Sequence, residues 1–390
     1  MSASARRFMA MSAGIGTAAL TIALVAGVVD DRGGFFNAYL VAYTFWLGLG
    51  LGSLGVAVVQ FLTGGHWGLV ARRIFEAGAS TLPLMALLFV PLLFGLPRLY
   101  AWARPQDVAN DPILQHQALY LNVPLFLVRT VIYLLIWSAL ALVVRRWSLA
   151  QDVREDAELA LLRLQRFSIV AALVLAITVT FAAIDWLMSL DTDWYSTMYP
   201  PMVATAFLLL ALAFAIVVVA TLAPRSVIGD LATPGVYNNL GSLLLALLML
   251  WAYMSYFQYL LIWAGNLTDE IPWYLRRVTG GWLAVALLLG AFGFTVPFVC
   301  LLFRPLKRNP RTLAAIATLI MVMLVVNAFW LIQPPFAPGG PILDWLALAA
   351  LVGIGGLWLA VFAWQLGSRP LLAAHDPRLA SALEEARGAA

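Results

Sequence analysis

Apolar runs of about twenty residues recur along nearly the whole chain. A helix of about 20 residues is just long enough to cross the roughly 30 Å hydrocarbon layer of a bilayer. Hydrophobic residues make up 63% of the chain and charged residues 11%, whereas a soluble domain is about half apolar and a quarter charged. Since a soluble core could not bury this much apolar surface, the sequence predicts an all-α integral membrane protein.

Ten runs are long enough to span a bilayer, and each predicts one transmembrane helix. The predicted spans are about 8–29, 36–63, 76–97, 120–144, 167–190, 201–222, 237–264, 279–303, 312–333 and 342–366. The connectors between them are short and rich in Pro, Gly and charged residues. Residues 1–390 are therefore expected to form a single transmembrane domain, with 145–166 as a helical connector on the cytoplasmic side.

The basic residues are distributed unequally between alternate connectors. Seventeen of the 23 lie on the side of the N-terminus and five on the other side, and Arg129 lies within a span. By the positive-inside rule, both termini are expected in the cytoplasm. The basic residues sit at the ends of spans, where they meet anionic lipid, and they form no basic stripe with interleaved aromatic residues. This placement argues against nucleic-acid binding.

Cysteine and histidine are too few, and wrongly placed, for a redox centre. Cys300 is the single cysteine, so the chain cannot supply the four thiolates of an iron–sulfur cluster. His66, His116 and His375 lie in connectors or in the C-terminal tail, whereas a membrane haem is held between histidines on facing helices. We expect this chain to bind no haem or iron–sulfur cluster, and the sequence has no motif of a self-contained enzyme.

Two ionisable residues lie inside predicted spans, where a charge costs about 2.5–3.5 kcal/mol on insertion scales. Arg129 is nine residues into the fourth span, and Asp185 is near the outer end of the fifth, which runs in the opposite direction. Helical side chains lean toward the N-terminus of their helix. The Arg129 guanidinium and the Asp185 carboxylate should therefore lie at a similar depth in the membrane if the two helices are neighbours. The pair is either a structural ion pair or part of a proton path or quinone pocket.

Glu76 is placed at the cytoplasmic start of the predicted third span, directly after Arg72 and Arg73. A carboxylate at a helix start is favoured by the positive end of the helix dipole, and this is the interpretation we prefer. The alternative is that Glu76 opens a cytoplasmic proton entrance.

Polar residues also gather in the outer halves of two spans and at the outer surface. The seventh span carries Tyr253, Ser255, Tyr256, Gln258 and Tyr259, and the ninth carries Asn327 and Gln333. Such groups can line a hydrated path, bind a quinone carbonyl, or tie helices together at about 0.6 kcal/mol per hydrogen bond. At the outer surface, an interfacial belt is expected from Asp191, Asp193, Trp194, Tyr195 and Tyr199.

Several segments between about residues 45 and 280 match one family in its order. They are Leu62-Thr63-Gly64-Gly65 to Trp67-Gly68, Arg72-Arg73 through Glu76 to Leu82-Pro83-Leu84, Tyr120-Leu121-Asn122-Val123-Pro124, Thr178 to Asp185-Trp186-Leu187-Met188-Ser189-Leu190, Trp194-Tyr195-Ser196-Thr197, Tyr256-Phe257-Gln258-Tyr259-Leu260-Leu261-Ile262-Trp263, and Pro272-Trp273-Tyr274-Leu275-Arg276-Arg277. In these segments the chain resembles the NrfD-like membrane subunits of alternative complex III, a quinol:cytochrome c oxidoreductase, and specifically the second of its two large NrfD-like subunits.

The resemblance implies ten helices arranged as two four-helix bundles plus two extra helices, in a bacterial inner membrane. It implies a sister NrfD-like subunit, which would hold the productive quinol site, and extracytoplasmic subunits that bear the iron–sulfur clusters and c-type haems. A proton-path role would carry over onto Arg129, Asp185 and Glu76. The chain departs from the family at Gln60-Phe61, where relatives carry histidines, so a proton route that needs a histidine there does not carry over.

Three hypotheses for function follow. The first is a cofactor-free membrane subunit of a quinol:cytochrome c oxidoreductase that contributes helix packing and a proton half-channel or quinone contact. The second is a purely structural membrane scaffold whose buried charges hold helices together. The third is a solute transporter, which is less favoured because the sequence has no convincing inverted repeat and no pair of broken helices at the midplane.

Overall fold

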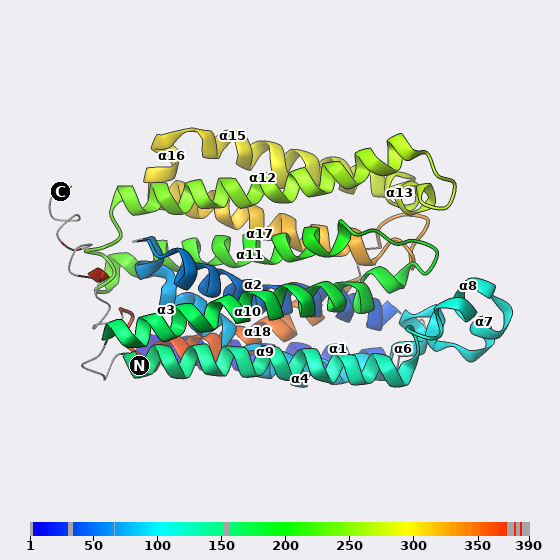
Figure 1. Ribbon diagram of the computed structural model, residues 1–390, viewed down its shortest axis with the longest axis horizontal. Helices are drawn as coiled ribbons and strands as arrows, with labels where there is room; N and C mark the ends of the chain where they lie inside the picture. Colours follow the sequence, from blue (N-terminus) through cyan, green and yellow to red (C-terminus); the bar gives the residue numbers. More distant parts are fainter. Residues whose placement is uncertain are drawn as a thin grey trace.

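The computed structural model describes residues 3–29, 34–65, 67–151, 157–342, 344–372, 378–379 and 383, and within these ranges all regular structure is helical (Figure 1). Ten segments in the described part of the chain are long and apolar enough to cross a membrane. The prediction of an all-α membrane protein with ten spans is therefore confirmed. An even number of spans returns the chain to the side on which it begins.

Ten helical stretches make up the spans. They are α1 (Ala3–Val29), α2 (Gly34–Thr63), α3 (Trp67–Ala79) continued by α4 (Leu82–Leu88) and α5 (Val90–Leu93), α9 (Val123–Gln151), α10 (Ala157–Trp186), α11 (Tyr199–Leu222), α12 (Pro234–Gly265), α14 (Trp282–Leu288) continued by η4 (Leu289–Thr295) and α15 (Val296–Leu302), α17 (Pro310–Ile332), and α18 (Trp345–Gly367). Short helices form the connectors. They are α6 (Leu96–Leu99), η1 (Ala101–Ala103), α7 (Pro105–Asn110), α8 (Pro112–Gln117), η2 (Met188–Leu190), η3 (Ala223–Arg225), α13 (Ile271–Val278) and α16 (Arg304–Arg308).

Local chemistry sets several helix starts. Thr233 caps α12 by accepting from the Val236 N–H, and Pro234 at the first helical position needs no hydrogen-bond partner for its nitrogen. Asn309 caps α17 in the same way, again with a proline directly after it. Helix α12 ends at Asn266, whose φ of 48° is left-handed and stops the helix.

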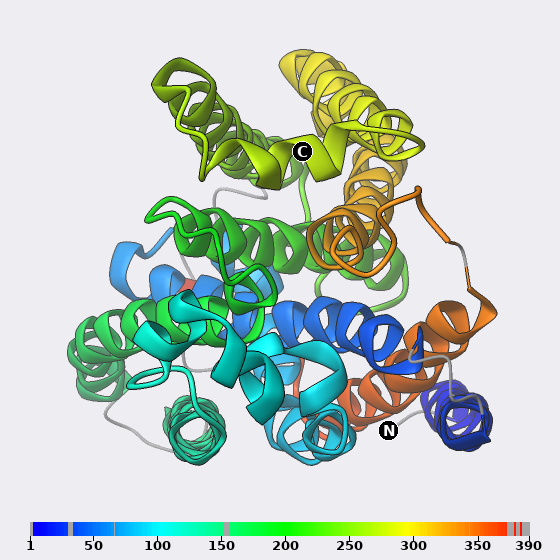
Figure 2. The same cartoon turned by 90° about the vertical axis from the view of Figure 1, so that its right-hand side faces the viewer.

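The spans form two four-helix bundles and an outer pair. The first bundle contains α2, α3 with α4, α9 and α10, and the second contains α11, α12, α14 to α15, and α17. Helices α2 and α11 lie side by side at the centre and join the bundles. Helices α1 and α18 pack along each other at the edge, and in Figure 2 they lie together at the lower right.

Glycines allow the closest helix contacts. A Cβ atom at Gly52 of α2 would lie 1.9 Å from the Phe207 carbonyl oxygen of α11, and Gly48 meets the Phe207 ring. At the edge pair, a Cβ at Gly16 of α1 would lie 2.6 Å from the Leu357 nitrogen of α18. A Cβ atom cannot fit at Gly52 or at Gly16, so backbone packs against backbone there, as is typical of membrane helices.

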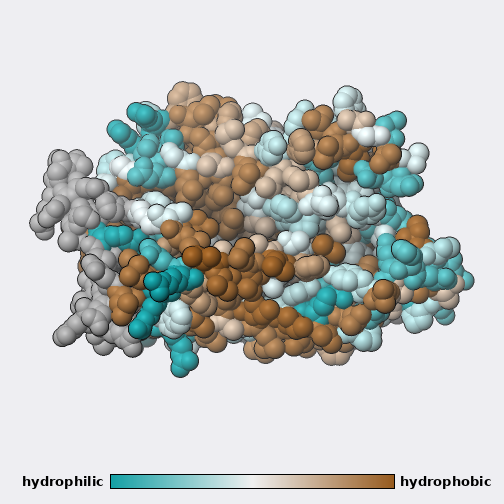
Figure 3. All heavy atoms as spheres, viewed as in Figure 1, coloured by the Kyte–Doolittle hydropathy of each residue, from teal (hydrophilic) through white to brown (hydrophobic). Residues whose placement is uncertain are grey.

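The surface agrees with burial in a bilayer. Figure 3 shows hydrophobic residues across the middle of the molecule and hydrophilic residues gathered toward its two ends. Large apolar side chains are exposed along most spans, for example Leu135 of α9, Leu173 of α10 and Leu287 of α14. Lipid tails would cover these side chains, because contiguous apolar surface of this extent is rare in a soluble protein.

Two predicted boundaries differ from the structure. The third span begins at Trp67 rather than 76, because Arg72 and Arg73 are buried inside α3 by ion pairs rather than left in a connector. The predicted connector 145–166 is divided between the end of α9 and the start of α10, and residues 152–156 lie outside the described residues. His66 and His375 also lie outside the described residues, and His116 is exposed on α8.

Candidate functional site

The predicted pair of Arg129 and Asp185 is confirmed. Asp185, on the last turn of α10, is fully buried, and the Arg129 side chain on α9 is 17% exposed. Arg129 Nε donates to Asp185 Oδ2 at 2.8 Å, and Nη2 donates to Oδ1 at 3.0 Å. The Tyr133 hydroxyl, one turn further along α9, donates to Oδ2 at 2.9 Å. The carboxylate thus accepts a two-pronged arginine contact and a phenol at once.

Tyr120 connects this pair with the end of the molecule that bears α6 to α8. The Arg129 guanidinium lies 3.9 Å from the centre of the Tyr120 ring, and Arg129 Nη1 donates to the Tyr120 carbonyl at 3.0 Å. Tyr120 itself is partly exposed. A path of polar groups therefore leads from this surface through Tyr120 to the buried Asp185.

Aromatic hydrogen bonds hold α9 against α10 around the pair. Trp186 Nε1 donates to the Thr130 hydroxyl at 3.1 Å, and Trp137 Nε1 donates to the Thr178 hydroxyl at 2.8 Å. Tyr100 donates to the Trp186 carbonyl at 2.9 Å, so the loop after α6 is tied to the same layer. These bonds fix the two helices in the register at which Arg129 and Asp185 meet.

Glu76 lies in a second buried cluster, and its predicted position at a helix start is wrong. It is nine residues beyond the start of α3 and accepts from Arg72 Nε at 2.9 Å and from Arg73 Nη1 at 2.8 Å. Ser148 of α9 donates to Glu76 and accepts from both arginines. The arginines at i−4 and i−3, rather than the helix dipole, therefore hold the charge of Glu76.

Gln60 lies beside the Glu76 cluster with both amide heavy atoms unsatisfied. Its side chain is fully buried, and neither Oε1 nor Nε2 hydrogen-bonds to any group in the described residues. It packs against the start of α3, because a Cβ at Gly68 would lie 2.3 Å from Gln60 Cγ. Phe61, the next residue, lies under the Arg72 guanidinium. Gln60 is thus a buried polar residue whose amide has no hydrogen-bond partner among the described residues.

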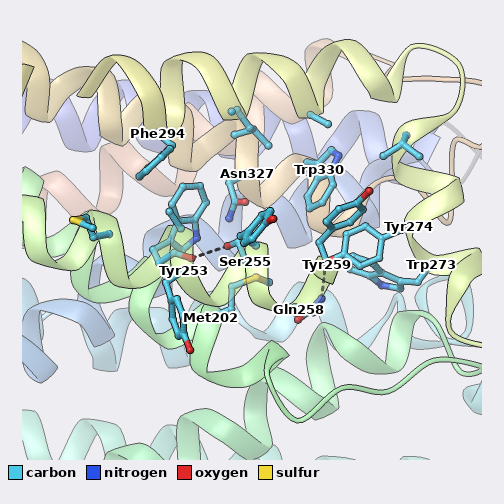
Figure 4. Close-up of a pocket in the computed structure, with 18 residues that line it drawn as sticks. Met202, Tyr253, Ser255, Gln258, Tyr259, Trp273, Tyr274, Phe294, Asn327 and Trp330 are labelled. Carbon is cyan, nitrogen blue, oxygen red and sulfur yellow. Dashed lines mark hydrogen bonds between the residues drawn. The ribbon is translucent and has the colours of Figure 1, made fainter. Parts of the chain in front are cut away.

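Tyr256 and Gln258 do not belong to either cluster. They line a cavity of about 570 Å³ in the second bundle, between α12, α13, η4 and α17 (Figure 4). Gln258 is 1% exposed, whereas Tyr256 at the rim is 64% exposed. Asn327 of α17, the polar residue noted in the ninth span, faces the same cavity. The five candidate residues are therefore distributed over three separate places.

A third ion cluster was not predicted. Asp191, in the loop after α10, accepts from Arg276 Nη1 and from Arg277 Nη2, the latter at 3.1 Å. Arg277 also donates to the Leu331 carbonyl at 2.8 Å and lies 3.6 Å over the Trp273 ring. Burial lowers the pKa of Arg277, and the charge of Asp191 opposes this effect. The cluster ties α13 of the second bundle to the end of the first.

No model of a protein family matches the chain, and no curated protein matches it. Within the described residues, no three His, Cys, Asp or Glu side chains are grouped so that they could hold a metal ion. The function must therefore be inferred from the fold and from the buried polar groups of this chain.

Proposed function

We propose that this chain is a membrane subunit of a quinol:cytochrome c oxidoreductase of the alternative complex III type, and that its first bundle carries protons. In this proposal it lies in a bacterial inner membrane with both termini in the cytoplasm. Its partners are a sister NrfD-like subunit and extracytoplasmic subunits that bear the iron–sulfur clusters and c-type haems. This chain would bind none of those redox groups itself.

The observation that carries the proposal is the pair of fully buried carboxylates at two depths of one bundle. Asp185 lies toward the end that bears α6 to α8, since Tyr100 after α6 bonds to the neighbouring Trp186, and Glu76 lies toward the opposite end, since it bonds to Ser148 near the last turn of α9. Ionised groups inside a membrane protein are costly and rare, and they commonly mark proton or ion paths. Both carboxylates are reached by hydroxyl groups of α9, namely Tyr133 and Ser148.

The distance between the clusters favours two half-channels over one continuous chain of side chains. Tyr133 and Ser148 are 15 residues apart on α9, which corresponds to about 22 Å along the helix axis. That is too far for direct proton transfer between them. In the proposed mechanism, Tyr120 and Tyr133 pass protons to or from Asp185, and a proton on Asp185 would weaken its hold on Arg129. The unsatisfied amide of Gln60 would order water beside the Glu76 cluster.

The second candidate is a purely structural scaffold, and one observation favours it. The Asp185 carboxylate already accepts three hydrogen bonds, so it is satisfied without any transferred proton. A buried ion pair of this kind can serve only to fix helix register.

Membership of the complex is tested by purification through a tag on this chain. The expected result is co-purification of proteins with c-type haem absorbance and quinol oxidation activity. Isolation as a single protein with no electron-transfer partner would contradict the proposal. The chain purified away from partners should show no haem spectrum, and a stoichiometric b-type spectrum would also contradict it.

Proton transfer is tested with Asp185→Asn in the whole complex, reconstituted in liposomes. Asparagine keeps the shape and some hydrogen bonds, so assembly should persist while protons translocated per electron fall. Asp191→Asn is the matched control, since it also removes a buried carboxylate bound to arginine, but one in the loop after α10 that contacts neither Asp185 nor Glu76. Assembled Asp191→Asn complex should keep full coupling. Full proton coupling in assembled Asp185→Asn complex would leave the scaffold as the better explanation.

A further inference from the structure

The cavity of the second bundle has an uncharged, largely apolar lining. Of the described residues that line it, none carries a charge, and most are aromatic or aliphatic. An ionised phosphate or carboxylate would have no counter-charge there, and burying such a group without one is very costly. At about 570 Å³, the volume lies within the range of about 300–1,000 Å³ that is typical of small-molecule sites. The lining therefore selects an uncharged ligand with an apolar body.

Two buried polar groups in the lining have free hydrogen-bonding capacity. Gln258 Nε2 contacts the Tyr274 hydroxyl at 3.4 Å, but Gln258 Oε1 has no partner in the described part of the chain. Trp251 Nε1 also has no partner there. These two residues are seven positions apart on α12, so they share one helix face at a spacing of about 10.5 Å. A buried polar atom without a partner costs free energy that a suitable ligand would recover.

The wall opposite α12 is shaped by a π-helical turn. Helix α14 passes into η4 (Leu289–Thr295), and Gly290 of this turn lines the cavity. No atom lies within 4 Å of a Cβ built on Gly290, so the space beside it is open. Turns of π-helix are rare and occur frequently at functional sites.

The cavity opens toward the surface that the bilayer would cover. Tyr253 and Tyr256 line the cavity and are 58% and 64% exposed, and both lie on the membrane-spanning part of α12. A ligand can therefore enter sideways from the lipid. Gln258 and Asn327 lie in the outer thirds of α12 and α17, so the polar head would sit nearer the surface and the apolar tail nearer the midplane.

We infer that this cavity binds the ring of an isoprenoid quinol drawn from the bilayer. A ring hydroxyl can donate to Gln258 Oε1, and a second ring oxygen can accept from Trp251 Nε1. The tail would leave past Tyr256 into the lipid. The choice of a quinol among uncharged amphiphiles rests on the proposed function. The site is separate from the productive quinol site expected on the sister subunit, and the inference includes no electron transfer here.

The test measures quinone binding by the full-length chain in nanodiscs made from quinone-free lipid. The probe is a decyl-substituted benzoquinone, whose ring quenches the fluorescence of nearby tryptophans, and its reduced form is measured by competition. Saturable quenching is expected from wild type. Gly290→Leu should weaken binding at least ten-fold, because Gly290 lines the cavity and a larger side chain there would take up open space at its wall without a clash. Gln258→Leu should weaken binding of the reduced form about five-fold, through loss of one hydrogen bond.

Gly14→Leu is the matched control. Gly14 of α1 likewise has no atom within 4 Å of a built Cβ, but it lies away from the cavity, so this variant should bind like wild type. Equal, unsaturable quenching in all four proteins would overturn the inference. A phospholipid that co-purifies with wild type and is lost from Gly290→Leu, with no effect on quinone binding, would overturn it in favour of an acyl chain.

The quinone-binding inference and the proton-path proposal can each be refuted without the other. Asp185→Asn should bind the probe like wild type, because Asp185 lies in the other bundle. Normal proton coupling in the whole complex together with no quinone binding would refute the cavity inference alone. Normal quinone binding with full coupling in Asp185→Asn would refute the proton path alone.

Discussion

Replacing Arg129 or Asp185 with leucine should destabilise the protein by unequal amounts. In Arg129→Leu, Asp185 stays fully buried without a counter-charge, although the Tyr133 hydroxyl still donates to it, and breaking a buried ion pair this way costs about 3–5 kcal/mol. In Asp185→Leu, Arg129 remains 17% exposed and keeps its contacts with Tyr120, so its head can move toward the surface. The loss for Asp185→Leu should therefore be smaller.

The double variant should recover much of the loss, because neither charge is then buried without its partner. Its remaining deficit is the Tyr133 hydroxyl, which loses its acceptor and costs about 1–3 kcal/mol when buried unpaired. Adding Tyr133→Phe should remove that deficit as well. The free energies of unfolding are measured by titrating micelles with a denaturing detergent and following tryptophan fluorescence.

Two results would refute this reasoning. If the two single losses simply add in the double variant, the residues do not act as a pair in the folded protein. If Asp185→Leu proves the more damaging single change, then Arg129 has no route to the surface and the local geometry is wrong.

Three further outcomes are expected. Arg277→Leu should leave Asp191 with Arg276 as its remaining partner and lower the free energy of unfolding by about 1.5–3 kcal/mol, the cost of losing a hydrogen bond to a charged group, and a loss below about 1 kcal/mol would show that this cluster does not hold the bundles together. Gly52→Leu should abolish folding, measured as the yield of monodisperse protein, because a Cβ alone would overlap the backbone of α11. In a background where the native cysteine is replaced by serine, Asp193→Cys should react with an impermeant thiol reagent from outside intact cells. Arg308→Cys should react only after the membrane is opened, and the reverse pattern would invert the predicted orientation.

The fold could be predicted from sequence because the length of an apolar run is itself the constraint. The contact between Arg129 and Asp185 could also be predicted, since the direction of each helix sets the direction in which its side chains lean. Both inferences depend on properties of one span at a time or of two neighbouring spans. They need no knowledge of the rest of the packing.

The remaining features depend on contacts that no local pattern encodes. Ser148 is an ordinary hydroxyl near a span end, and only packing of α3 against α9 brings it to Glu76. Asp191 and Arg277 are far apart in sequence, and their pairing needs the two bundles to be assembled. The cavity depends on the π-helical turn at Gly290, which a period of 3.6 residues cannot indicate.

The contact between α2 and α11 has a mechanical consequence. Interfaces made of flexible side chains can slide, because the side chains change rotamer, but at Gly52 the main chain of one helix lies against the main chain of the other. A rotation of one bundle against the other would drive these backbones into each other. This contact therefore resists rotation of α2 against α11, which is the motion that rocking of the two bundles for alternating access would require.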